Sequence, residues 1–483
     1  MGQPSPMQRR KGASKQVRAR STCSTSFVRG VFLLTLGCVV LLWTWTIWSS
    51  DIFGEVPEDE KLLLKQLTDD VNSGIETENE AAEHAADHDQ QQQTPLEPKA
   101  IVAYMVSLTH CKSIKFSENT HLTDGAVVLK HSIHLNSIEN YAESKSLYGY
   151  KMYAIVHPIA KSCSKVLKDA GYEILIRETP INVDDIKEDF LREKVVTNGC
   201  CGEKEYNKLW AYTMKDHPIA VHLDLDTLVI QPMDDLFDAM LDGNDSPARS
   251  RVPVMHDKEL PDGDQIQAYF TRDYNMIQPK KKVVGVQGGF IVLRPSEEAF
   301  KEYQDIIIEG KFFPGSGWGG LGFGGFFGGM TFQGLVPYFY DHQHPGTGVE
   351  LNRCIYNSMA DNPRMPAHAD KDANKCRDGH EECEDCRETD ISKIKSVHFT
   401  ICQKPWNCKP FANGSLCNDF HHKWFQVRKS LEDRWAEITG DESLIEKRNG
   451  SYHPDHFMGY CNHAGTGGYI PAVVPECVEN ECK

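Results

Sequence analysis

An apolar run that carries two carboxylates in its middle constrains this chain more than any other feature. The run IAVHLDLDTLVIQPMDDLF, from Ile219 to Phe237, has the composition of a buried β-strand, yet Asp224 and Asp226 interrupt it. Alternate residues of a strand share a face, so we expect both side chains to project to the same side. A buried charge without a partner is costly. A divalent cation, Mn²⁺ or Mg²⁺, would compensate two carboxylates at the end of a strand.

The surroundings of this D-x-D pair are informative, whereas the pair itself is not. The same spacing recurs in polar surroundings, where solvated loops explain it, at Asp87/Asp89, Asp262/Asp264 and Asp370/Asp372. Phosphatases of the haloacid dehalogenase type also end a strand in two aspartates, but their D-x-D-x-[TV] pattern places one residue between the second Asp and the Thr. Here Thr227 follows Asp226 directly, so the spacing disfavours a phosphatase.

The first hundred residues predict a membrane anchor. Residues 1–29 hold seven basic residues and no acidic one, and a charge-free apolar stretch over 30–49 follows. That length spans a bilayer, and the charge asymmetry predicts a cytosolic N-terminus. We therefore expect a cytosolic basic tail over 1–29, a transmembrane signal anchor over 30–49 and an acidic, disordered stem over 50–98. The protein would then be a single-pass type II protein of the Golgi membrane; a cleaved signal peptide is the alternative.

From about residue 99, segments of strand type and helix type alternate. Strands are expected over 100–108, 150–158 and 172–179, and helices over 122–136 with Thr123 as cap, 161–171 and 203–214. Such alternation indicates an α/β domain whose sheet is covered by helices on both faces and binds ligands beyond the carboxyl ends of its strands. We place this lumenal domain over 99–410 and a cysteine-containing extension over 411–483.

Charge and cysteine content narrow the function classes. The formal net charge of −17 argues against a nucleic-acid-binding protein. The chain has 16 cysteines, and on the oxidising side of a membrane most of them should form disulfides. A zinc site that includes the sequence Cys383-Glu-Asp-Cys386 is the alternative.

Four further segments occur in an informative order: YNKLWAYTMKDHPIAVHLDLDTLVIQPMDDLF (206–237), VQGGFIVLRPSEEAF (286–300), FQGLVPYFY (332–340) and VHFTICQKPW (397–406). Together they resemble the motifs of the glycogenin-like glycosyltransferases of family 8, which have the GT-A fold. The resemblance implies a Rossmann-like mixed sheet and an Mn²⁺-dependent, retaining transfer of a hexose or uronic acid from a UDP-sugar. The acceptor would be a glycan, a glycoprotein or a glycolipid. Mg²⁺ is the alternative ion, and a homodimer is left open.

The resemblance also assigns roles to individual residues. His398 would join Asp224 and Asp226 as a metal ligand, and Gln333 and Lys404 would be catalytic. Contacts to the nucleotide sugar are expected from Ser107, Lys208, Asp224, Leu225, Asp226, Gln287, Gly289 and Lys404. A metal ion and Lys404 would neutralise the charge that develops on a departing nucleoside diphosphate. Taken singly, His398 could be an ordinary buried histidine and Lys404 a surface cation.

The sequence departs from the family pattern in three places, and the first two support a second hypothesis, a catalytically inactive lumenal glycan-binding or scaffold protein. Phe332 stands where the family has an aspartate, and Cys402 stands where it has a glycine. The glycine-rich segment 314–330 replaces the ordinary acceptor-side loop. Its aromatic residues predict a mobile platform on which a sugar ring stacks; a disordered insertion is the alternative. The aromatic residues of this segment are Trp318, Phe323, Phe326 and Phe327.

Overall fold

The computed structural model describes residues 96–111, 120–277, 283–366, 374–443, 457–461 and 468–475, all within one unit that spans 96–483. The predicted basic tail and anchor, almost all of the predicted stem and part of the C-terminal extension lie outside the described residues. Among the residues that are described, no helix has the length and apolar character needed to cross a membrane.

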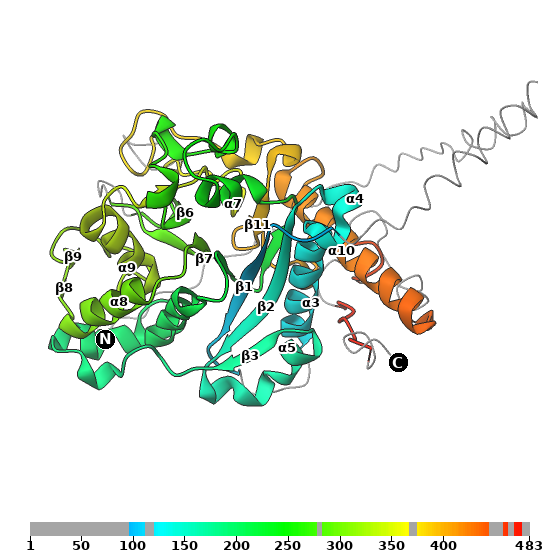
Figure 1. Cartoon of the computed structure of the whole chain (residues 1–483), viewed down its shortest axis with the longest axis horizontal. Coiled ribbons are helices and arrows are strands. Elements are labelled where there is room, and N and C mark those ends of the chain that lie inside the picture. Colours follow the sequence, from blue (N-terminus) through cyan, green and yellow to red (C-terminus); the bar gives the residue numbers. More distant parts are fainter. Residues whose placement is uncertain are drawn as a thin grey trace, which may run out of the picture. The chain divides into compact units, whose positions relative to one another are not determined.

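A seven-stranded sheet forms the centre of this unit, in the strand order β10-β6-β7-β4-β1-β2-β3 (Figure 1). The strands are β1 Ala100–Leu108, β2 Tyr148–Val156, β3 Glu173–Ile176, β4 Ala220–Leu223, β6 Ala268–Arg272, β7 Val286–Leu293 and β10 Gly348–Glu350. Strand β1 pairs in parallel with β2 and β4, whereas β7 runs antiparallel to both β4 and β6. Every residue of β7 is buried, as a sheet covered on both faces requires. The expected α/β class and its mixed sheet are confirmed.

Helices cover both faces of the sheet, and each face has its own hydrophobic core. One core contains residues of α3 (Thr120–Leu135), α5 (Lys165–Asp169), α7 (Asp234–Leu241) and α10 (Leu416–Thr439). The other contains residues of α6 (Asp189–Lys194), the 3-10 helix η5 (Gly202–Thr213), α8 (Glu297–Glu309) and α9 (Phe332–Tyr338). The short α4 covers Tyr141–Ser144. Thr123 was expected to cap the helix after β1, but it lies inside α3, which begins three residues earlier.

The apolar run from Ile219 to Phe237 is not one strand, and this corrects the expectation for its centre. Strand β4 ends at Leu223 and β5 covers Thr227–Val229, so Asp224 and Asp226 lie in the turn between them. The turn is closed by Thr227 N–H, which donates to the Asp224 carbonyl oxygen (3.1 Å). Strand β5 belongs to a separate two-stranded sheet with β11, Ser396–His398; β8 (Phe312–Phe313) and β9 (Gly317–Trp318) form another.

Among the described residues of the unit, five disulfides join the loops, as the cysteine content predicts. They are Cys111–Cys163, Cys354–Cys386, Cys376–Cys383, Cys402–Cys417 and Cys408–Cys461. The two cysteines of the sequence Cys383-Glu-Asp-Cys386 belong to different disulfides, so the pairing leaves no thiolates there for zinc. The Cys402–Cys417 and Cys408–Cys461 disulfides attach the C-terminal extension to the segment that follows β11.

A buried charge network holds α10 against α3, and the two helices lie side by side in Figure 1. The Arg428 guanidinium is fully buried and lies 2.6 Å from the Asp124 carboxylate and 2.9 Å from that of Glu432. The Ala472 backbone N–H donates to the same Asp124 oxygen (3.0 Å). Breaking a buried ion pair by removing one partner leaves an uncompensated charge in the interior. Arg428 therefore joins two helices and a distant tail segment.

Replacement of this arginine tests how much the network stabilises the unit. Arg428→Met would leave the Asp124 and Glu432 carboxylates buried without their cation, and we expect it to lower the free energy of unfolding by about 3–5 kcal/mol. Lys429→Met removes an exposed pair with Asp433 on the same helix and should cost at most about 0.5 kcal/mol. Urea unfolding followed by tryptophan fluorescence measures both. Equal effects of the two substitutions would contradict this account.

Candidate functional site

Three potential metal ligands converge where the chain passes from β4 in the main sheet to β5. Strand β5 pairs with β11 so that Thr227 stands opposite His398. The Nε2 atom of His398 lies 3.4 Å from Asp226 Oδ1 and 3.9 Å from Asp224 Oδ2. One ligand atom from each of the three side chains lies within 4.8 Å of the other two. The break in the apolar run is thus what brings the two aspartates to the histidine.

Two lysines compensate the carboxylates. The Lys208 ammonium, buried on η5, lies 3.0 Å from Asp224 Oδ1 and donates to the Gly288 carbonyl oxygen (2.7 Å). The Lys404 ammonium pairs with Asp226 and donates to the Phe399 carbonyl oxygen (2.6 Å). Burial alone would raise the pKa of Asp224, but Lys208 and then His398 outweigh it and hold that pKa at about 2. The Asp224 carboxylate is therefore charged at neutral pH.

The donor set suits a divalent cation with a preference for oxygen ligands. Burial lowers the pKa of His398, so its imidazole is neutral at neutral pH, the form in which histidine binds metals. Its Nδ1 atom is buried and has no hydrogen-bond partner in the described part of the chain. Two carboxylates with one imidazole fit Mn²⁺ well. The predicted residues Asp224, Asp226 and His398 are thus placed together, as the expected metal site requires.

Glycine is required at position 289 by the close approach of the histidine. A Cβ atom on Gly289 would lie 2.5 Å from His398 Cε1 and 2.8 Å from its Nδ1, closer than real Cβ contacts. The backbone N–H of Gly289 also donates to Gln287 Oε1 (2.6 Å), and its carbonyl oxygen accepts from Asp224 N–H (3.1 Å). Gly289, predicted to contact the nucleotide sugar, therefore positions both a carboxylate and the imidazole.

Gln333 lies close to Lys208, and the residue before it, Phe332, carries no carboxylate. A Cβ atom placed on Gly288 would lie 3.3 Å from Gln333 Cγ and 3.4 Å from Lys208 Nζ, so both side chains lie over that residue. Gln333 is half-buried in the first turn of α9. Phe332, where the family has an aspartate, is fully buried, with the Lys208 ammonium 5.9 Å from the centre of its ring. Phe332 thus places an apolar ring in this position.

The remaining predicted residues make other contacts near the trio of Asp224, Asp226 and His398. Ser107 Oγ, near the carboxyl end of β1, lies 2.8 Å from Nε2 of the buried His222 on β4. Gln287 Oε1 also accepts from Asn357 Nδ2 (3.1 Å). The Gln287 side chain thus links Asn357 to the backbone of β7 at Gly289. Leu225 is partly buried and packs against the core on the α3 face.

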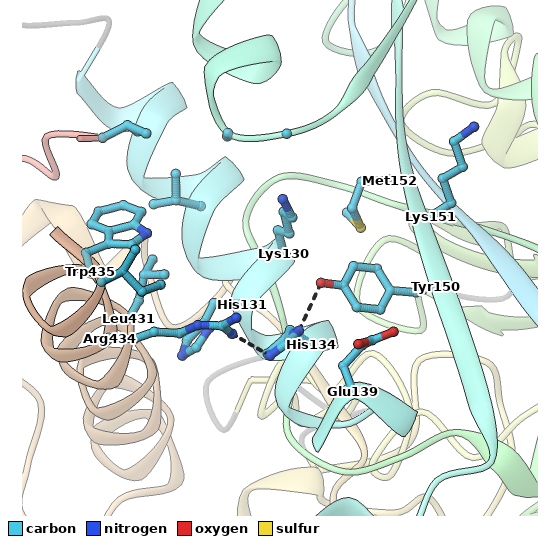
Figure 2. A pocket seen from close by; sticks show the side chains of 15 residues that line it. Lys130, His131, His134, Glu139, Tyr150, Lys151, Met152, Leu431, Arg434 and Trp435 are labelled. Carbon is cyan, nitrogen blue, oxygen red and sulfur yellow. Dashed lines mark hydrogen bonds between the residues drawn. The ribbon is translucent and has the colours of Figure 1, made fainter. Parts of the chain in front are cut away.

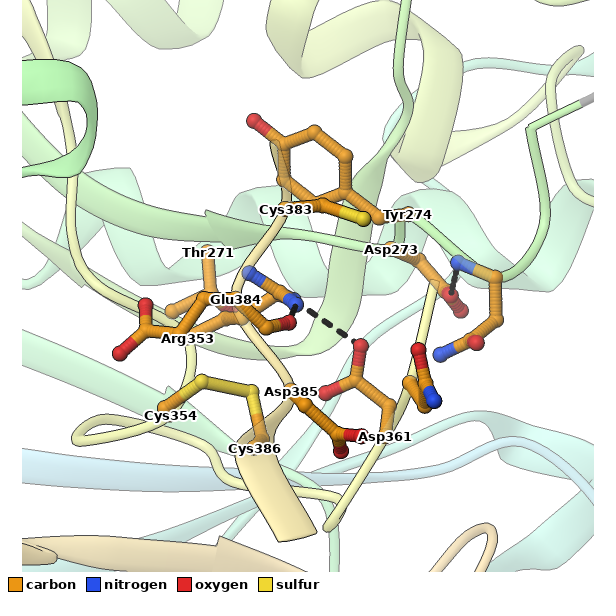
Figure 3. Close-up of polar contacts among 12 residues, drawn as sticks. Thr271, Asp273, Tyr274, Arg353, Cys354, Asp361, Cys383, Glu384, Asp385 and Cys386 are labelled. Atoms are coloured by element: carbon orange, nitrogen blue, oxygen red, sulfur yellow. Dashed lines mark hydrogen bonds and ion pairs between the residues drawn. A yellow bond between two sulfur atoms is a disulfide. The ribbon is translucent and has the colours of Figure 1, made fainter. Parts of the chain in front are cut away.

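Asp273 is a buried carboxylate that the sequence analysis missed. It follows β6 directly and is 8% exposed. Burial and then the neighbouring Asp361 raise its pKa to about 6, while His398 lowers it, which places Asp273 within electrostatic reach of the trio. Figure 3 shows Asp273 and Asp361 in one polar group with Arg353, whose Nε donates to Asp361 (2.9 Å). In the sequence Asp273 follows Thr271 and Arg272, so no apolar run marks it.

The glycine-rich segment 314–330 differs from the expected aromatic platform. Trp318 is fully buried and donates from Nε1 to the Gly329 carbonyl oxygen (3.0 Å), and Phe323 is also buried. These two rings pack under α9, so they cannot stack on a ligand. Phe327, 52% exposed, and the half-buried Phe326 are the aromatic side chains of the segment that solvent reaches.

A cavity of about 410 Å³ lies elsewhere, between α3, β2 and α10 (Figure 2). Arg434 donates to His134 Nε2 (2.5 Å), whose Nδ1 lies 3.2 Å from the Tyr150 hydroxyl. Burial and then Arg434 lower the pKa of His134 to about 4, so this histidine is neutral. The residues that line the cavity include none of those predicted for the site.

Comparison with known proteins yields only remote likenesses. No protein-family model and no curated protein sequence matches the chain. Among solved structures, apo WbbM, a bifunctional glycosyltransferase, has a TM-score of 0.34 at 13% identity over 68% of this chain and 50% of its own. Mouse xyloside xylosyltransferase 1 has a TM-score of 0.35 at 11% identity, over 62% of this chain and 97% of its own. An active-site mutant of LgtC has a TM-score of 0.36 at 12% identity, over 68% of this chain and 95% of its own. This chain thus spans half the length of WbbM.

Because every one of these TM-scores is below 0.5, the likenesses assign no ligand or activity to this chain. What the chain does has to follow from its own residues.

Substitution of Gly289 tests the metal site directly. Gly289→Ala would push the His398 ring away from the aspartates, and we expect Mn²⁺ affinity to fall by about tenfold or more. Gly325→Ala is the matched control, because a Cβ atom there meets nothing within 4 Å. Electron paramagnetic resonance of free Mn²⁺ measures both affinities. Wild-type affinity in Gly289→Ala would show that His398 is not a ligand.

The raised pKa of Asp273 predicts a pH-dependent stability. An acid whose folded-state pKa is above its unfolded value destabilises the fold as pH rises, here from about pH 4 to about pH 6. Asp273→Asn removes that ionisation and should raise the free energy of unfolding at pH 7 by up to about 3 kcal/mol, with little effect at pH 4. Urea unfolding of the metal-free protein at both pH values measures this. A variant that is less stable than wild type at pH 7 would contradict it.

Proposed function

We propose that this chain is a glycosyltransferase that uses a UDP-sugar donor and Mn²⁺. The observation that carries the proposal is the convergence of Asp224, Asp226 and His398 with the ammonium groups of Lys208 and Lys404. Each of these five residues lies in one of the segments that resemble the family 8 motifs. The resemblance supplies the donor class, and the site supplies a charge arrangement that suits it.

The charges of the site explain why a metal ion and a diphosphate would bind together. Lys208 pairs with Asp224 and with Glu205, Lys404 pairs with Asp226, and His398 is neutral. A bound Mn²⁺ would add two positive charges and stabilise the negative charge on the leaving diphosphate. The diphosphate would in turn offset the added positive charge. We therefore expect UDP to raise the affinity for Mn²⁺, and Mn²⁺ to raise the affinity for UDP by the same factor.

Lys404 is the residue best placed to act on the leaving group. Its ammonium is about one-third exposed, whereas that of Lys208 is buried against Asp224 and the Gly288 carbonyl oxygen. A partly exposed cation beside the metal ligands can turn from Asp226 to a phosphate oxygen without being drawn out of the core. In this scheme Lys208 fixes Asp224, and Lys404 stabilises the departing diphosphate.

The stereochemical course and the acceptor follow from the resemblance. Retention of the anomeric configuration is the family's outcome, and a same-face displacement beside Gln333 agrees with the place of that side chain over Gly288. The donor sugar would be a hexose or a uronic acid, and the acceptor a glycan, a glycoprotein or a glycolipid. The proposed setting, a type II protein of the Golgi membrane, rests on the apolar stretch 30–49 and the basic residues before it.

A binding protein without activity is the second candidate. The fully buried Phe332 favours it, because the ring occupies a position where the family has a carboxylate. The two functions separate by experiment, since an inactive protein can bind a ligand but releases no UDP.

The decisive experiment measures UDP release from a panel of UDP-sugars by the purified full-length chain, with Mn²⁺ or with EDTA. We expect Mn²⁺-dependent hydrolysis of one donor. Asp224→Asn/Asp226→Asn should abolish it, and Lys404→Met should lower kcat by about 100-fold, as loss of one charge-stabilising donor does. Lys429→Met, on the exposed face of α10, is the control for a lost lysine and should retain full activity.

Two other outcomes have definite meanings. Mn²⁺-dependent UDP binding without release from any donor, even with a mixture of glycan acceptors, would favour the binding protein. Absence of UDP binding with every metal tested would overturn both the donor class and the metal-site assignment.

A further inference from the structure

Two adjacent cysteines at the start of η5 have free thiols. The other ten cysteines that the structure describes form five disulfides, whereas Cys200 and Cys201 do not pair. Cys200 is exposed and Cys201 is half-buried, so a small reagent can reach the pair from solvent. Consecutive Cα atoms are about 3.8 Å apart, shorter than in ordinary disulfides, so a disulfide between neighbours is strained and easily reduced.

A continuous series of polar contacts joins this pair to the candidate metal site. Cys200 Sγ donates to Glu205 Oε1 (2.8 Å), and Glu205 Oε2 lies 3.3 Å from the Lys208 ammonium. The same ammonium lies 3.0 Å from Asp224 Oδ1. Glu205 is almost fully buried, so it is these side chains and not solvent that surround its carboxylate. Two side chains, those of Glu205 and Lys208, therefore connect Cys200 to the candidate metal ligand Asp224.

The two thiols differ in reactivity. The contact with Cys200 lowers the pKa of the Cys201 thiol, while the same contact, burial and Glu205 raise the pKa of the Cys200 thiol. Cys201 also precedes the first residue of η5, and a helix N-terminus stabilises a thiolate. Cys201 is thus suited to attack a disulfide, and Cys200 to act second with Glu205 as the nearby base.

We propose that Cys200 and Cys201 form a thiol–disulfide exchange site that controls the metal site. The Cys201 thiolate attacks one sulfur of a low-molecular-weight disulfide, R–S–S–R, forms a mixed disulfide and releases R–S⁻. Cys200 then loses its proton to Glu205 and attacks the Cys201 sulfur, which releases the second R–S⁻. Glu205 passes this proton to a released R–S⁻ and is again a carboxylate. The two cysteines are oxidised to a vicinal disulfide, and the small disulfide is reduced to two thiols after protonation.

Formation of the Cys200–Cys201 disulfide changes the surroundings of Lys208. The Cys200 S–H no longer donates to Glu205, so this buried carboxylate competes more strongly with Asp224 for the Lys208 ammonium. Gly202, which follows the pair, has a φ of +63°, and Gly199, which precedes it, packs on Gly328 of the glycine-rich segment. A backbone shift at the pair thus also reaches the segment before Gln333. The coupling to the metal site rests on the proposed function, whereas the exchange chemistry does not.

Peptide mapping of the full-length chain tests the exchange site. Trypsin releases VVTNGCCGEK, residues 195–204, which contains both cysteines and no other. The reduced protein is treated with glutathione disulfide, alkylated and digested. We expect this peptide to take up no alkyl group and to be lighter than the unmodified dithiol peptide by two hydrogen atoms. Dithiothreitol treatment before alkylation should restore two alkyl groups.

Three results of the mapping would overturn the exchange site. The peptide could retain two reactive thiols, stop at a glutathione adduct, or be cross-linked to the tail peptide that carries Cys477 and Cys482. Cys200→Ser is the matched control for the second step, since Cys201 alone can form only the glutathione adduct.

The coupling of the cysteine pair to the metal site is measured on the reduced protein and on the protein oxidised with glutathione disulfide. We expect oxidation to weaken Mn²⁺-dependent UDP binding by about tenfold, as the loss of a supporting contact near metal ligands does. The oxidant should have no effect on Cys200→Ser/Cys201→Ser. Equal affinities in the oxidised and reduced wild type would overturn the coupling. If neither form binds UDP, the proposed function and the coupling both fail, while the exchange site stands on the peptide masses alone.

Discussion

The structure depends on how two carboxylates at the end of a buried strand are compensated. Asp224 and Asp226 follow β4 directly, and without partners their charges would prevent this edge of the sheet from being buried. Lys208 on η5, 16 residues before Asp224, and Lys404 after β11, 178 residues beyond Asp226, supply those partners. The site is therefore assembled by ion pairs between separate elements of the fold.

The C-terminal extension supports this arrangement from behind. The Cys402–Cys417 disulfide joins the segment that carries Lys404 to the first turn of α10, and His421 Nε2 lies 2.9 Å from the Cys402 carbonyl oxygen. Arg428 then fixes α10 to α3 through Asp124. This explains why a cysteine stands where the family resemblance leads one to expect a glycine. Cys402 holds the loop by a covalent bond to a helix that the resemblance does not cover.

Local patterns in the sequence predicted much of the fold. Apolar runs located β1 and β2, which are largely buried, and β3, a partly buried strand at the edge of the sheet. Helical spacing located α3 and η5, because such helices bury one stripe of side chains. The boundary at Thr123 was wrong, since α3 begins at Thr120. Trp318 and Phe323 were expected to be exposed because glycines surround them; α9 covers them instead. Asp273 was missed because its environment is made by Asp361, far away in the sequence.

The sequence by itself determined the class of the fold, the disulfide-rich character and the residue types of the candidate site, because these depend on hydrophobic period, cysteine content and short motifs. The tertiary structure alone decided that the apolar run breaks at Asp224, since only pairing with β11 draws β5 out of the main sheet. It also decided that Glu205 connects Cys200 to Lys208. The physical reason is that the contacts of a buried charged group depend on side-chain placement and often on distant partners, as for Asp226 with Lys404, so neither residue type nor spacing predicts them.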